Sequence, residues 1–178
     1  MLRYALIYGG LSGAIVIAII SVTLMTMGPE SAASSQLSGY ATMVAALSLV
    51  FVGVKRYRDI EQGGVISFKT GAGVGLAMAV VAGFVYTIGW ELVLFATDFA
   101  FIETFSQSMI EGIKAQGLPA AEEAAQLAEI ESGIEMYRNP LFRLPITFSE
   151  IIPVGIAVAL VSALILKNSN VLPARAAA

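Results

Sequence analysis

The sequence predicts an all-α membrane protein, a four-transmembrane-helix bundle with amphipathic extracytoplasmic helices between spans three and four. The first observation is where charge is missing. Asp, Glu, Lys and Arg are absent between Arg3 and Glu30, between Glu30 and Lys55, between Lys69 and Glu91, and between Glu150 and Lys167. Each gap can hold an apolar helix of about 20 residues, the length that crosses a bilayer at ~1.5 Å per residue.

Composition is the second observation. The chain has 178 residues, of which 57% are hydrophobic and 13% charged. A soluble domain usually has roughly 25% charged residues, so lipid must be part of the solvent, and we expect one membrane domain over residues 1–178. The absence of Cys and His excludes His/Cys metal sites and thiolate nucleophiles and removes the usual general base. We therefore expect no metal, no cofactor and no enzymatic activity.

The spans follow from these gaps in order. The first covers residues 4–27 and exceeds the ~7–15-residue apolar core of a signal peptide, which is the alternative for this segment. A short polar loop is predicted over residues 28–36. The second span covers 37–54 and ends at a run of basic residues. The third covers 70–95 and the fourth covers 144–166, closed by Lys167 and Asn168.

The long connection over residues 98–143 contains two apolar patterns with helical spacing. The first consists of Phe99, Ile102, Phe105, Met109 and Ile113, and the second of Leu127, Ile130, Ile134 and Tyr137. A Gly-Leu-Pro sequence at residues 117–119 separates them. The spacing predicts two amphipathic helices on or near the membrane surface, with a flexible loop as the alternative.

The orientation is predicted from the distribution of Lys and Arg. One side collects Arg3, Lys55, Arg56, Arg58, Lys69, Lys167 and Arg175, with Asp59 and Glu61. The other side is acidic and collects Glu30, Asp98, Glu103, Glu111, Glu122, Glu123, Glu129, Glu131 and Glu135, with Lys114, Arg138 and Arg143. Because basic segments stay in the cytoplasm, we expect a multi-pass protein of the inner (cytoplasmic) membrane with both termini cytoplasmic.

Glu91 and Glu150 are the charged residues inside the predicted spans. A carboxylate at mid-bilayer costs about 2.5–3.5 kcal/mol on insertion scales, so such groups face protein or water. Both are predicted in the outer half of the membrane, where they could be neighbours. With Arg138, Asn139 and Arg143 they form a candidate polar or ion site. The alternative is a polar layer in which each Glu has an Arg or a backbone N–H as its partner.

Three further patterns have a structural and a functional interpretation. Small residues recur every four positions in the third span and predict close helix packing, with a homo-oligomer face as the alternative. Aromatic residues near the outer ends of the spans are typical of an interfacial belt, with ligand stacking as the alternative. Lys55, Arg56 and Arg58 are expected to contact lipid head groups. The small residues are Gly71, Gly75, Ala79 and Gly83, and the aromatic residues are Tyr86, Trp90, Phe95 and Tyr137.

Several stretches together resemble the bacterial integral membrane family catalogued as domain of unknown function 4199. They are YALIYG at residues 4–9, GY at 39–40, FVGVKRYRD at 51–59, GGVISF at 63–68, Tyr86 with Trp90, YRNP at 137–140 and TFSEIIPVG at 147–155. The resemblance implies a four-helix protein of the bacterial inner membrane. It supplies no activity and no catalytic residue, but it marks Glu150 and residues 55–59 as positions to mutate.

For function, we expect a non-enzymatic accessory or scaffolding subunit. The reason is that polar groups concentrate at one edge of the predicted bundle and that the sequence shows no set of residues typical of a catalytic site. Its partners would be membrane lipid and another membrane protein or a second copy of the chain, and not nucleic acid. The second hypothesis is a small ion- or solute-transporter or channel component that uses Glu91 and Glu150. A membrane enzyme acting on lipid-linked substrates is the third.

Overall fold

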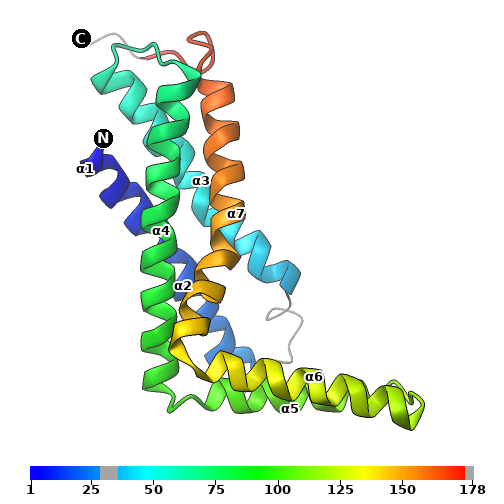
Figure 1. Ribbon diagram of the computed structural model, residues 1–178. Helices are drawn as coiled ribbons and strands as arrows, with labels where there is room; N and C mark the ends of the chain where they lie inside the picture. The colour runs from blue at the N-terminus through cyan, green and yellow to red at the C-terminus, as the bar shows by residue number, and fades with distance from the viewer. Residues whose placement is uncertain (29–35, 175–178) are drawn as a thin grey trace.

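The computed structural model describes residues 1–28 and 36–174, which form helices joined by short turns (Figure 1). Within these described residues, four helices are long and apolar enough to cross a membrane. The first runs over Leu2–Met27 and comprises α1 (Leu2–Tyr4), a π-helical turn (Ala5–Gly9) and α2 (Gly10–Met27). The others are α3 (Gln36–Glu61), α4 (Phe68–Ala96) and α7 (Pro140–Leu166). The predicted four-span helical fold is confirmed.

Local capping explains why two spans start earlier than predicted. The Asn139 side chain accepts a hydrogen bond from the Leu141 backbone N–H at 3.0 Å, and Pro140 occupies the first helical position, so α7 begins at Pro140. The Ser67 hydroxyl accepts from the Thr70 N–H at 3.1 Å and starts α4 at Phe68. Residues 29–35 of the predicted polar loop lie outside the described residues.

The small residues of α4 pack against α7. A Cβ atom added at Gly71 would lie 3.2 Å from the Ala163 Cβ, and one at Gly75 would lie 2.9 Å from the Ala159 Cβ. Farther along, a Cβ at Gly83 would meet the Phe148 ring at 2.6 Å. The prediction of close packing is confirmed for these positions of the stripe, which are covered by α7 within the chain.

The first span packs on another side of α4 in the same way. Cβ atoms added at Gly9 and Gly13 would lie 2.3 Å and 2.5 Å from the backbone oxygens of Met78 and Ala82. Small residues on the first span and on α4 thus let the two helices approach closely, and α4 becomes the central helix with neighbours on several faces. In agreement, α4 is the most buried of the four spans.

Helices α5 (Ala100–Lys114) and α6 (Ala120–Arg138) form a hairpin, with the turn at residues 115–119 between them. Figure 1 shows the hairpin lying across one end of the bundle and extending past it, while α1, the α3–α4 turn and the end of α7 lie toward the opposite end. The two helices predicted in the connection are therefore present, and the alternative of a flexible loop is wrong.

Among the described residues, the base of the hairpin packs on the spans. Ile102 of α5 is buried in a cluster with Trp90 and Leu94 of α4, and Ile134 and Tyr137 of α6 pack against the same cluster. The hairpin tip is mostly exposed. The apolar residues predicted for α6, among them Leu127 and Ile130, are half-buried.

Candidate functional site

Glu91 and Arg143, two of the predicted site residues, form an ion pair between α4 and α7. The Arg143 Nε donates to Glu91 Oε1 at 2.7 Å and Nη2 donates to Oε2 at 2.6 Å. Arg143 is 3% exposed and the Glu91 side chain 26%. This bidentate contact is the strongest hydrogen-bonding geometry between a guanidinium and a carboxylate. The charge of Glu91 is therefore balanced inside the chain.

Arg143 also joins the end of α6 to the corner between α4 and α5. Its Nη1 donates to the backbone oxygens of Tyr137 at 3.2 Å and Arg138 at 3.1 Å. Its guanidinium lies 5.4 Å from the centre of the Phe99 ring. Phe99 and the preceding Asp98 both have left-handed backbone conformations, with φ of 58° and 48°. Residues other than glycine rarely adopt this conformation. Arg143 thus acts as a clamp on a strained corner.

Glu150 has different surroundings from Glu91. It lies two turns beyond Arg143 along α7, about 10 Å at ~1.5 Å per residue. The Tyr86 hydroxyl donates to its Oε2 at 3.2 Å, and no described Lys or Arg pairs with it. The two carboxylates that the sequence placed at similar depth therefore occupy successive layers of the bundle, and each has its own partner.

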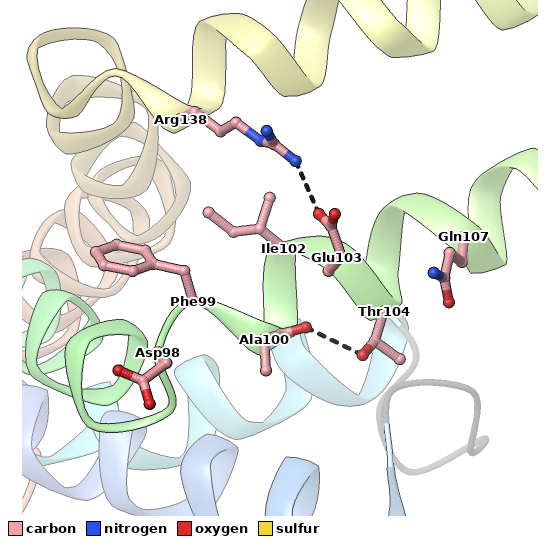
Figure 2. A pocket seen from close by; sticks show the side chains of 8 residues that line it. All are labelled: Asp98, Phe99, Ala100, Ile102, Glu103, Thr104, Gln107 and Arg138. Carbon is pink, nitrogen blue, oxygen red and sulfur yellow. Dashed lines mark hydrogen bonds and ion pairs between the residues drawn. The ribbon is translucent and has the colours of Figure 1, made fainter.

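The remaining predicted residues of this site serve the hairpin and the start of α7. Arg138 donates through Nη2 to Glu103 Oε2 at 2.8 Å, and both side chains are well exposed. Figure 2 shows this ion pair at the edge of a hollow of about 710 Å³, with Asp98 and Phe99 on the other side. Asn139 is the cap of α7, as described above. In the described chain, no hydrogen bond or ion pair joins either side chain to Glu150.

A larger groove of about 810 Å³ lies between the spans and the hairpin. We call it the aromatic groove. It is lined by α2, α3, α4 and both hairpin helices, and Glu150 of α7 lies at its edge. Its aromatic side chains are Tyr40, Tyr86, Trp90, Phe101, Phe105 and Tyr137. Its charged side chains are Glu129 and Glu150, and no Lys or Arg is among the described residues that line it.

A short polar network connects the walls of the groove. The Trp90 Nε1 donates to the Tyr137 hydroxyl at 2.9 Å, which links α4 to α6. Burial raises the pKa of the Tyr137 hydroxyl, so this group stays protonated at neutral pH and can still donate. The buried Thr147 Oγ1 nearby makes no hydrogen bond of good geometry. Polar groups thus meet an otherwise apolar space, the usual composition of a ligand pocket.

The structure corrects the prediction of an aromatic belt at two positions. Tyr86 is 4% exposed and Trp90 is 5% exposed, so neither faces lipid. Trp90 instead packs edge-on against Phe101 with ring centres 4.9 Å apart. Phe95 is 76% exposed, as a belt residue would be. The four-residue spacing of Tyr86 and Trp90 places both on one face of α4, which is the signal that could have indicated a shared environment.

The basic cluster at the other end also requires a correction. Arg58, expected to contact lipid head groups, is fully buried. It pairs with Asp59 at 2.8 Å and donates to the backbone oxygens of Val171 and Leu172 after α7. Its charge is therefore used to hold the chain end against α3. Lys55 pairs with Asp59 at 2.5 Å, whereas Arg56 is exposed and donates to the Tyr8 hydroxyl at 3.3 Å.

The chain was compared with known protein families, curated proteins and solved structures. The family of proteins of unknown function designated DUF4199 matches residues 3–168, nearly the whole chain. The chain belongs to the DUF4199 family. No curated protein and no solved structure matches it. The match covers all four spans and the hairpin of this DUF4199 protein and assigns no activity to any of its residues.

Proposed function

We propose that this DUF4199 protein is a non-enzymatic, multi-pass protein of the bacterial inner membrane that acts as an accessory or scaffolding subunit. Both termini would lie in the cytoplasm and the hairpin outside. The observation that carries the proposal is the hairpin, which projects past the bundle (Figure 1) and has a mostly exposed tip around residues 111–120. A projecting arm of this kind suits contact with a neighbouring membrane protein.

The charge of the arm indicates which surface it would meet. Glu111, Glu122, Glu131 and Glu135 are exposed on the hairpin, and Lys114 and Arg138 are its basic residues. A net acidic arm is repelled by anionic head groups and attracted to a basic protein surface. The partner would therefore be a membrane protein with a basic patch beside its outer membrane surface.

Photocrosslinking in native membranes tests this proposal. A photoreactive amino acid at Gln116, in the exposed turn between α5 and α6, should give a discrete protein adduct. The same group at Val161, which is 54% exposed on the apolar surface of α7, should react with lipid alone. Glu122→Lys should weaken the Gln116 adduct. Lipid adducts at both positions, together with isolation as a lone monomer, would argue against a partner.

A second proposal is a small ion- or solute-transporter or channel component that uses Glu91 and Glu150. The lack of a described basic partner for Glu150 supports it, while the ion pair of Glu91 with Arg143 weakens it. Ion or solute flux into proteoliposomes distinguishes the two proposals. Flux that is lost in Glu150→Gln would favour transport over the accessory role.

A further inference from the structure

We propose that the aromatic groove binds a cationic amphiphile, a molecule with an amine or quaternary ammonium head and an apolar body. The proposal concerns a site inside the chain. It goes beyond the accessory role and does not depend on it, because the partner of the hairpin would contact the exposed tip, whereas the groove is lined by residues 101–109 and 129–137, nearer the spans.

The first argument is an unbalanced charge. Of the two carboxylates inside the spans predicted from the sequence, Glu91 has a guanidinium at 2.6 Å, whereas Glu150 has only the Tyr86 hydroxyl, at 3.2 Å, among the hydrogen-bond partners in the described chain. A carboxylate accepts at about four lone-pair sites, so Glu150 keeps unused acceptor capacity. Glu150 is exposed on the surface of a helix long and apolar enough to cross a membrane, and within a membrane a charge is costly without a counterion. A bound cation would supply the counterion that the described residues do not.

The second argument is the chemistry of the groove walls. Aromatic faces attract cations, and an apolar space of this volume lies within the usual ligand-pocket range of about 300–1,000 Å³. Tyr86 and Trp90 are almost fully buried and form the floor, and Tyr40 and Phe105 are exposed at the rim. Side chains from α2 and α6, including Ile20, Leu24 and Ile134, supply an apolar wall for the body of the ligand.

The third argument concerns the ligands that the groove disfavours. A phospholipid carries a phosphate and requires a basic or N–H-rich surface. The described lining residues include two Glu and no Lys or Arg, and the Trp90 N–H is already used by Tyr137. An anionic head group would therefore lie beside Glu150 and Glu129 without a counterion. The charge pattern favours an occupant with a positive head and no phosphate.

Trp90 provides a direct probe because it is the single Trp of the chain. The intact protein in non-ionic detergent micelles would be titrated with three bromoalkyl amphiphiles of equal chain length, whose bromine quenches indole emission. Their head groups would be trimethylammonium, phosphocholine and sulfonate. We expect saturable quenching at the lowest concentration for trimethylammonium, weaker quenching for phosphocholine and the weakest for sulfonate.

The charge partner is tested by Glu150→Gln, which keeps the size of the side chain and an oxygen that can accept from Tyr86. This variant should raise the half-quenching concentration of the trimethylammonium probe by roughly tenfold, the scale of one charge-assisted contact, and leave the sulfonate probe unchanged. The matched control is Glu103→Gln, which makes the same change in net charge at an exposed carboxylate outside the groove.

Several outcomes would overturn the proposal. Equal quenching by the trimethylammonium and phosphocholine probes would assign the groove to phospholipid instead. An equal rise in the half-quenching concentration of the trimethylammonium probe in Glu150→Gln and Glu103→Gln would show a general effect of net charge. Unliganded Trp90 emission reports whether the Glu150→Gln variant keeps its fold. If the Glu150→Gln variant does not keep its fold, Tyr86→Phe serves as the second variant, because it removes only the hydroxyl that competes for Glu150. Tyr86→Phe should keep or strengthen quenching by the trimethylammonium probe. Weaker quenching in Tyr86→Phe would contradict the proposal.

Discussion

Arg143 connects several elements at the hairpin end of the molecule. It contacts α4 through Glu91, the last turn of α6 through two backbone oxygens, and the α4–α5 corner through the Phe99 ring. A buried guanidinium is tolerated only when its donors are satisfied, and here the partners come from three elements. The pair with Glu91 therefore has a structural role, whereas Glu150 remains open to a ligand.

Glu91→Gln should destabilise the protein, because it leaves the buried Arg143 charge without its counterion. We expect the free energy of unfolding to fall by roughly 2–4 kcal/mol. This loss is somewhat smaller than that for a fully buried ion pair, because Glu91 is partly exposed. The measurement is thermal unfolding in detergent. Glu103→Gln breaks the exposed pair with Arg138 and should cost at most about 1 kcal/mol. Equal losses in the two variants would contradict a clamp at Arg143.

At the scale of elements, the close packing of α4 with α7 and the first span organises the bundle. Lipid tails are as apolar as the helices, so association depends on surface fit rather than on escape from water. Small residues provide this fit, since Gly75 of α4 lies next to Ala159 of α7 and Gly9 of the first span lies next to the Met78 backbone of α4. The four-residue spacing visible in the sequence therefore corresponds to a real contact surface.

A pair of alanine substitutions on α4 tests this contact. Gly75→Ala should destabilise the protein by roughly 1–3 kcal/mol, because the new methyl group would lie 2.9 Å from the Ala159 Cβ and force the helices apart. Gly73→Ala on the same helix would meet only the end of the Met1 side chain at 3.9 Å. It should be neutral or stabilise by up to about 1 kcal/mol through helix propensity. Thermal unfolding of both variants would check this, and a reversed order would refute it.

At the scale of the whole molecule, charge sign separates along the bundle axis. Arg3 lies in α1, Lys55 and Arg56 near the end of α3, Lys69 in the first turn of α4 and Lys167 directly after α7. These helix ends lie opposite the acidic hairpin (Figure 1). Because Lys and Arg are retained in the cytoplasm during insertion, this separation predicts the hairpin outside.

Single-cysteine labelling tests the orientation cleanly, because the chain has no native Cys. Gln116→Cys, in the turn of the hairpin, should react with a membrane-impermeant maleimide in intact spheroplasts. Gln62→Cys, exposed after α3, should react only after the membrane is permeabilised. The opposite pattern would invert the topology and place the hairpin in the cytoplasm.

The sequence alone determined the number of spans, their order and the presence of the two connecting helices, because each depends on local hydropathy and spacing. It also identified Glu91, Glu150 and Arg143 as polar groups at the membrane level. Helix rotation and axial register, which decide which side chains meet, arise only from packing between distant segments. Tertiary structure therefore decided that Glu91 pairs with Arg143 while Glu150 pairs with Tyr86. It also decided that Arg58 is buried under the chain end and that aromatic side chains enclose a groove.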